Sequence, residues 1–144
     1  MKFTLATALI ALVPFTSALV TTRAPNTVAW DAVYDKGSTN LDAVACSDGA
    51  NGLKTKGFST FSSLPRFPLV GAVYAVEGWN SALCGTCWQV TYKNKSIYVL
   101  AIDHADEGFV LSKAAMNTLT NNQATQLGRV DANTVRVSKT NCGM

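Results

Sequence analysis

The sequence predicts a small, mainly β domain that is closed by disulfides and secreted. Three observations support this prediction: short runs of β-forming residues dominate, the chain has four cysteines, and its N-terminus is apolar. The chain has 144 residues, nearly half of them apolar, and contains no repeat or low-complexity stretch. This composition fits one compact domain of ordinary size.

The N-terminus has the pattern of a signal peptide. Lys2 precedes an apolar run from Leu5 to Phe15, and small residues suited to a signal-peptidase site follow at 16–18. The run is shorter than the roughly 20 residues that cross a bilayer, and no second apolar stretch follows. We therefore expect a signal peptide at 1–18, a single domain at 19–144, no membrane span and an extracellular protein.

Five segments have the composition of β-strands. They are Thr27–Tyr34, Val70–Val76, Trp88–Tyr92, Ile97–Ile102 and Thr134–Ser138. The polar loop 93–96 has hairpin length and joins the third segment to the fourth. Gly and Pro interrupt the stretch 49–68, which we expect to be mostly loop.

One helix is expected after the strand at 97–102. Ser112 can cap it, because Ala115, Met116 and Leu119 then fall on one face. The helix should end near Asn121, and its methionine and leucine are interpreted as core residues.

The segment 84–88, with the sequence Cys-Gly-Thr-Cys-Trp, contains two of the four cysteines. A zinc site would need a second such pair or a pair of histidines, which the chain lacks. A thioredoxin-like redox pair would open a helix, whereas the residues after Cys87 alternate as in a strand. Two disulfides are therefore expected. Spacing leaves all three pairings open, although Cys46 with Cys84 and Cys87 with Cys142 would cross-link more of the chain than a Cys84–Cys87 bond.

Charge and catalytic motifs exclude several functions. The formal net charge is only +3 and the charges are scattered, so neither nucleic acid nor an anionic membrane is indicated as a partner. No Gly-x-Ser-x-Gly elbow occurs, which argues against serine hydrolysis. We expect no metal and no other cofactor.

The densest polar cluster is the segment 103–107, which contains the only histidine, His104, and the carboxylates Asp103, Asp106 and Glu107. Its function could be acid–base catalysis or a ligand-binding rim, and its structural alternative is a solvated turn whose aspartates bond backbone amides. A glycoside hydrolase needs two carboxylates on either side of a sugar, and adjacent loop acids rarely meet that geometry. No catalytic residue is assigned.

Five segments together resemble the cerato-platanin family of small secreted fungal proteins. They are Val28–Asp35, Cys46–Leu53, Gly78–Trp79, Cys84–Trp88 and Gly128–Asp131, and in this order they extend over nearly the whole mature chain. The resemblance implies a six-stranded double-ψ β-barrel, related to the first domain of expansins and to barwin-like proteins, with one or two short helices. It also implies the disulfides Cys46–Cys84 and Cys87–Cys142.

The family is described as binding N-acetylglucosamine oligomers, loosening cellulose without clear hydrolysis, assembling at interfaces and eliciting plant defences. The resemblance thus implies a non-catalytic protein of the extracellular space or cell wall, with chitin, N-acetylglucosamine oligomers or cellulose as partners. By position, its carbohydrate-binding surface would include Asp103, Asp31, Ser47, Asp48, Asn51, Gly85 and Thr86. Trp30, Tyr34 and Trp79 are candidate stacking residues, whereas Trp88 and Phe109 are expected in the core.

Two departures and two alternatives accompany this prediction. Val110 stands where the family often has asparagine, and the loop 104–107 is more acidic than is common in the family. The alternatives are a weak endoglucanase-like hydrolase with Asp103 as the acid, and a surface-active structural wall protein. Finally, Asn94 begins the one Asn-x-Ser/Thr sequon with a permitted middle residue, which predicts a glycan on the hairpin loop.

Overall fold

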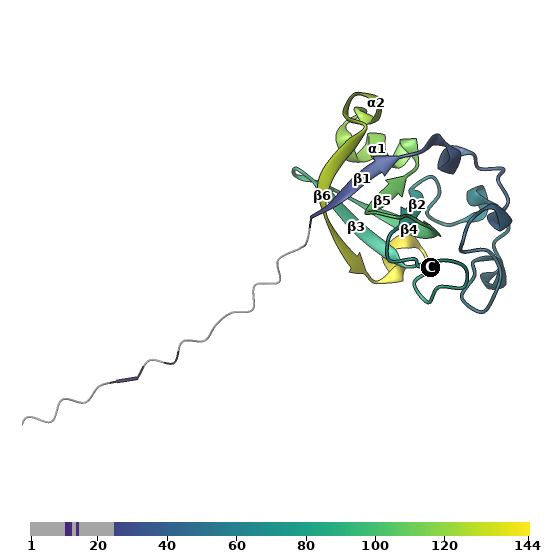
Figure 1. Ribbon diagram of the computed structural model, residues 1–144, viewed down its shortest axis with the longest axis horizontal. Helices are drawn as coiled ribbons and strands as arrows, with labels where there is room; N and C mark the ends of the chain where they lie inside the picture. Colours follow the sequence, from purple (N-terminus) through teal and green to yellow (C-terminus); the bar gives the residue numbers. More distant parts are fainter. Residues whose placement is uncertain (1–10, 13, 15–24) are drawn as a thin grey trace, which may run out of the picture.

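The computed structural model describes residues 11, 12, 14 and 25–144. Six strands close into a barrel in the order β1-β5-β2-β4-β3-β6 (Figure 1). The strands are β1 Pro25–Trp30, β2 Val70–Val73, β3 Cys87–Tyr92, β4 Lys95–His104, β5 Phe109–Leu111 and β6 Arg129–Val137, and the helices are α1 Lys113–Thr120 and α2 Ala124–Leu127. The predicted signal peptide at 1–18 lies almost wholly outside the described residues.

The barrel is a mixed sheet. β1 pairs with β5, and β2 with β4, in parallel, whereas the other neighbours are antiparallel. The predicted six-stranded β-barrel with one or two short helices and two disulfides is confirmed. Trp88 and Phe109 are buried, and their rings meet edge to face at 5.6 Å between centroids, which confirms both as core residues.

Two predicted strands end earlier than expected. β1 stops at Trp30 because the carboxylate of Asp31 accepts a hydrogen bond from the N–H of Val33 at 2.9 Å and caps a 3₁₀ helix at Ala32–Asp35. β2 stops at Val73, and a turn follows it. The hairpin turn is also tighter than predicted, because 95 and 96 already belong to β4 and only Lys93 and Asn94 remain between the strands.

Helix α1 begins and ends as predicted. The hydroxyl of Ser112 accepts a hydrogen bond from the N–H of Ala115, and Asn121 closes the helix in the left-handed conformation. The carboxylate of Asp35 accepts the N–H groups of Lys113 and Ala114 at 2.7 and 2.9 Å. This contact fastens the 3₁₀ helix after β1 to the start of α1.

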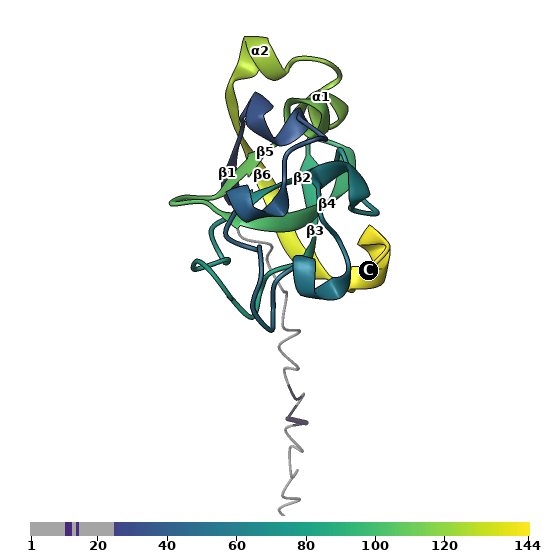
Figure 2. The same cartoon turned by 90° about the vertical axis from the view of Figure 1, so that its right-hand side faces the viewer.

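The disulfides are Cys46–Cys84 and Cys87–Cys142, as the family resemblance implied. The first ties the irregular segment 31–69 to the loop that precedes β3. The second ties β3 to the C-terminal 3₁₀ helix Lys139–Cys142. Figure 2 shows α1 and α2 together at one end of the molecule and this C-terminal turn (yellow) away from them.

Within residues 11, 12, 14 and 25–144, no helix combines the length and the apolar composition that a bilayer crossing requires.

Candidate functional site

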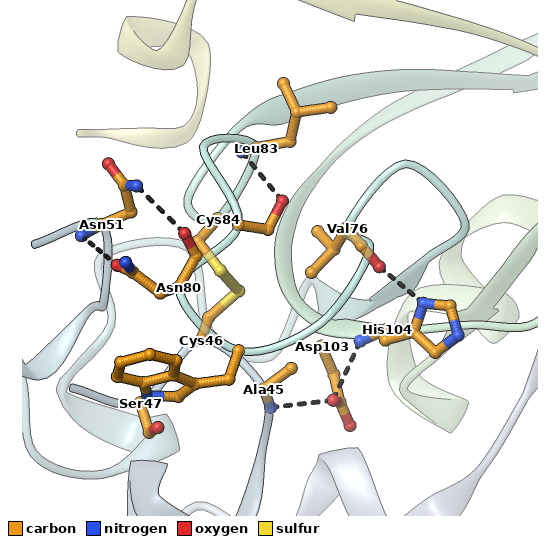
Figure 3. The surroundings of a disulfide bond; sticks show 12 residues. Ala45, Cys46, Ser47, Asn51, Val76, Asn80, Leu83, Cys84, Asp103 and His104 are labelled. Carbon is orange, nitrogen blue, oxygen red and sulfur yellow. Dashed lines mark hydrogen bonds between the residues drawn. A yellow bond between two sulfur atoms is a disulfide. The ribbon is translucent and has the colours of Figure 1, made fainter. Parts of the chain in front are cut away.

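Asp103 lies at the C-terminal end of β4 and accepts hydrogen bonds from three residues. Its Oδ2 accepts a hydrogen bond from the hydroxyl of Tyr34 at 2.8 Å. Its Oδ1 accepts the backbone N–H of Ala45 and that of His104, both at 2.9 Å, as Figure 3 shows beside the Cys46–Cys84 disulfide. The carboxylate therefore joins β4 to the segment that precedes Cys46.

Tyr34 serves as a donor to this carboxylate and does not present a ring to solvent. Burial, followed by the proximity of the Asp103 charge, raises the pKa of its phenol far above the ordinary value. The hydroxyl thus keeps its proton throughout the physiological range. Its ring packs beside Phe61 in the core, with 6.3 Å between centroids.

The side chain of His104 contacts two loop residues, Val76 and Asp106. Its Nδ1–H donates to the carbonyl of Val76 at 2.6 Å, and its Nε2 lies 3.1 Å from Oδ1 of Asp106. The carbonyl of Val76, and next the carboxylate of Asp106, raise the pKa of the imidazole. The imidazole is half-exposed, so the loop 103–107 combines the structural turn with an accessible polar edge.

A second group centres on Trp79, whose side chain is 63% exposed. Its indole N–H donates to Oδ1 of Asp48 at 2.7 Å, and the hydroxyl of Ser47 donates to the same oxygen at 3.3 Å. The indole N–H is the main reason that the pKa of Asp48 is lowered. An exposed aromatic ring is thus held in a fixed orientation, although its polar edge is already paired.

Asn51 and Asn80 hold the loops that carry this pair. The backbone N–H of Asn51 donates to Oδ1 of Asn80, and its side-chain Nδ2 donates to the carbonyl of Asn80, both at 3.0 Å (Figure 3). Gly49 lies beneath them at φ +82°, where a Cβ atom would stand only 2.8 Å from Oδ1 of Asn80. The close approach of the two loops therefore requires glycine at 49.

A shallow hollow of ≈ 440 Å³ lies beside Trp79, in the loop between β2 and β3. Glu77, Trp79 and Asn80 line it. We call the surface formed by Asp48, Glu77, Trp79 and Asn80 the Trp79 face. Glu77 and Asn80 were not among the predicted site residues; the neighbouring Gly78–Trp79 segment was the signal that could have drawn attention to them.

The remaining predicted site residues lie outside these two groups. Asp31 is exposed and caps the 3₁₀ helix after β1. Gly85 and Thr86 are buried, and the hydroxyl of Thr86 donates to the carbonyl of Leu83 and accepts the indole N–H of Trp88. Trp30 lies against the helices, where its N–H donates to the carbonyl of Ala124 at 2.7 Å and Lys113 stands over its ring.

The described part of the chain contains no cluster of three histidine, cysteine or acidic side chains arranged to hold a metal ion. The structure thus brings Tyr34, Asp103 and His104 into one polar junction, and Ser47, Asp48, Asn51 and Trp79 into a second group. Figure 3 shows the Cys46–Cys84 disulfide with Asn51 and Asn80 on one side of it and Asp103 and His104 on the other.

These features define a small, disulfide-closed β-barrel with an exposed tryptophan whose polar neighbours lie on the surrounding loops. The family model for cerato-platanin matches residues 26–144, and the chain belongs to this family.

Named relatives agree with this assignment. An "Allergen Asp f 15 homolog" from Arthroderma benhamiae is 50% identical over 145 residues, which cover 99% of this chain and 70% of that protein. The crystal structure of cerato-platanin 2 from M. perniciosa has a TM-score of 0.81 and 40% identity, covering 84% of this chain and 100% of its own. The solution structure of "the fungal elicitor Cerato-Platanin" has a TM-score of 0.74 and 36% identity, covering 81% and 95%. The terms allergen and elicitor describe biological effects and not catalytic reactions.

Proposed function

We propose that this protein is a secreted, non-catalytic carbohydrate-binding protein that takes N-acetylglucosamine oligomers on the Trp79 face. The observation that carries the proposal is the indole of Trp79, which is 63% exposed and held by a 2.7 Å hydrogen bond to Asp48. A large apolar ring fixed in solvent loses little conformational entropy when a ligand covers it. The apolar face of a sugar ring is a suitable partner for it.

The surroundings of the indole suit a sugar with hydroxyl and acetamido groups. Asp48 and Glu77 are exposed acceptors for hydroxyl groups, and Asn80 lines the adjoining hollow of ≈ 440 Å³. Chitin-type oligomers offer hydroxyls, amide N–H groups and apolar ring faces together. Cellulose offers the hydroxyls and ring faces without the amide, so we rank it second.

The chemistry of Asp103 favours binding over hydrolysis. A glycosidase acid must donate a proton to the leaving oxygen. Here the carboxylate accepts hydrogen bonds from Tyr34, Ala45 and His104, so both oxygens already act as acceptors. We infer that Asp103 shapes the rim of the binding surface by holding its loops and does not act as the acid of an endoglucanase.

The biological role that we propose rests on the family. Because a solved relative is called a fungal elicitor, we propose that the secreted protein acts at cell walls, with expansin-like loosening and elicitation of plant defence as its effects. Self-assembly at interfaces belongs to the same proposal.

The binding test is a titration of the mature protein with an N-acetylglucosamine hexamer, followed residue by residue by NMR. Trp79→Ala should weaken binding by about two- to tenfold, the value of one aromatic stacking contact. Trp79→Phe keeps an aromatic ring and loses the N–H that donates to Asp48. It therefore separates the effect of ring stacking on affinity from the effect of the fixed orientation. Leu127→Ala removes an exposed apolar side chain on α2 and should bind like the wild type.

Two results would contradict the proposal. One is wild-type affinity in Trp79→Ala, provided that its spectrum shows an intact fold. The other is the appearance of shortened oligomers with new reducing ends, because the hydrolase would then be the correct function.

A further inference from the structure

A second hollow, of ≈ 350 Å³, lies between the two disulfides, where Cys84 and Cys87 form part of its wall. Three cationic side chains line it: Lys56, Arg136 and Lys139. No aspartate or glutamate is among its lining residues. We call it the basic hollow.

The three cations of the basic hollow are unpaired within residues 25–144. The ion pairs found there join Lys54 to Asp42 and His104 to Asp106, and no side-chain hydrogen bond or aromatic ring engages the three cations. Partial burial, and then the charge of Lys139, lowers the pKa of Lys56. Positive charges thus face one another across a concavity with no internal counter-charge.

The fold brings these cations together from two distant parts of the chain, one that contains Lys56 and one that contains Arg136 and Lys139. Lys56 ends the 3₁₀ helix Lys54–Lys56, and Arg136 lies on β6. Lys139 begins the C-terminal 3₁₀ helix, which the Cys87–Cys142 disulfide ties to β3. Gly85 leaves room for the ammonium group, because a Cβ there would stand 3.2 Å from Nζ of Lys56.

We propose that the basic hollow binds the carboxylate-bearing ring of an acidic oligosaccharide, a uronate. Its volume lies at the lower end of the roughly 300–1,000 Å³ that is typical of small-ligand sites. Arg and Lys suit a carboxylate, and Ala82 and Val137 give the lining an apolar portion for the ring face.

Competing anions match the basic hollow less completely. An inorganic anion would use the cations and leave the apolar portion uncovered. A nucleic acid needs a stripe of cations that follows successive phosphates, whereas these three surround one small concavity. The inference goes beyond the proposed function, because N-acetylglucosamine oligomers carry no carboxylate and are assigned to the Trp79 face.

The test uses the mature, disulfide-bonded protein and a trimer of galacturonate, measured by calorimetry and NMR. The trimer should bind and shift the amide signals of Gly85 and Ser138. Its methyl ester, which has the same rings without the charge, should bind at least tenfold more weakly. Lys56→Gln, Arg136→Gln and Lys139→Gln should each weaken binding of the free acid by about five- to tenfold.

Lys36→Gln is the matched control, since it removes the same charge from an exposed lysine outside the basic hollow. Its affinity for the trimer should equal that of the wild type. Equal losses in Lys36→Gln and the three variants, or equal binding of the methyl ester, would overturn the proposal. So would inorganic phosphate that displaces the trimer at equal concentration, because the basic hollow would then be a simple anion site. The hexamer titration with Trp79→Ala reports on the other face, so either proposal can fail without the other.

Discussion

Asp103 shows how one side chain can organise a surface through the hydrogen bonds that it accepts. It accepts hydrogen bonds from Tyr34 in the 3₁₀ helix after β1, from Ala45 before the first cysteine, and from His104 at the end of β4. His104 then extends the junction to Val76 and Asp106. At the scale of single residues, the polar junction has a structural role, and its exposed edge is the side chain of His104.

The first prediction concerns the Asp103 carboxylate. Asp103→Ala leaves the N–H of Ala45 and the hydroxyl of Tyr34 without their acceptor, so it should lower the free energy of unfolding by about 2–3 kcal/mol. Tyr34→Phe removes one bond and should cost about 1 kcal/mol. Urea denaturation measures both. Glu107→Ala changes an exposed carboxylate outside the junction and serves as the control; if it costs as much as Asp103→Ala, the junction is not what stabilises the loops.

The second prediction concerns pH. The pKa of His104 is raised in the folded protein, first by the carbonyl of Val76, so protonation of the imidazole stabilises the fold. This contribution is complete below about 6.5, the ordinary value, and is lost as pH rises through the raised pKa. The difference in Tm between wild type and His104→Gln should therefore be larger at pH 5.5 than at pH 8.5. Asp106→Asn should retain part of this pH dependence, because the Val76 carbonyl remains; a difference in Tm that grows with pH would refute the assignment.

Among the elements, the longest strand determines where the polar residues lie. β4 runs from Lys95, beside the hairpin turn, to His104, at the polar junction. Its central residues from Val99 to Ile102 are buried, and its fully exposed residues lie at its two ends. The barrel thereby places Asp103 against the irregular segment 31–69, which contributes Tyr34, Ala45 and Asp48.

The third prediction concerns the disulfide that joins β3 to the C-terminal 3₁₀ helix. The Cys87–Cys142 bond closes a loop with a sequence separation of 55. In the loop-entropy model its removal costs about 4 kcal/mol. The double variant Cys87→Ser, Cys142→Ser should lose that amount in guanidinium denaturation and should release Lys139 from the basic hollow. A loss below about 1 kcal/mol would mean that barrel packing alone holds the C-terminal turn.

The fold was predictable where patterns are long or specific. β3, β4 and α1 follow from alternation, hairpin length and the Ser112 cap, and the disulfide pairing followed from the family resemblance. β5 was missed because three residues at 109–111 carry too little pattern, and β6 begins at Arg129, five residues before the predicted Thr134. β1 was predicted too long because Val33 and Tyr34 favour strands, whereas the Asp31 cap places them in a 3₁₀ helix.

For the molecule as a whole, the candidate site was predictable as a list of residues but not as an arrangement. Trp79 was one of three candidate stacking residues, and its orientation depends on a hydrogen bond to Asp48, which is 31 residues away in sequence. Tyr34 donates a hydrogen bond to Asp103, and Trp30 donates one to Ala124. These partners are also distant in the sequence. Long-range contacts decide which polar side chains are already paired, and short motifs do not encode them.

The whole molecule also carries two surfaces of opposite charge, whose hollows adjoin at Ala82, a lining residue of both. Asp48 and Glu77 belong to the Trp79 face, whereas Lys56, Arg136 and Lys139 line the basic hollow, and the segment 82–87 contributes residues to the wall of the latter. A net charge of only +3 therefore conceals local concentrations of each sign. Binding of neutral and acidic sugars should consequently respond differently to salt, with only the acidic ligand weakened strongly.

The last prediction concerns the glycan expected on Asn94. Asn94 lies in the turn that precedes β4, and Asp103 lies near the other end of that strand. Nine residues of extended chain span about 30 Å, so a glycan on Asn94 projects from the opposite end of the barrel. Protein from its native secreting host should carry the glycan by intact mass, and enzymatic removal should leave the affinity for the N-acetylglucosamine hexamer unchanged. An altered affinity after removal would place the binding surface near the β3–β4 hairpin, where Tyr92 and Lys95 line another hollow of ≈ 460 Å³, and would argue against the Trp79 face.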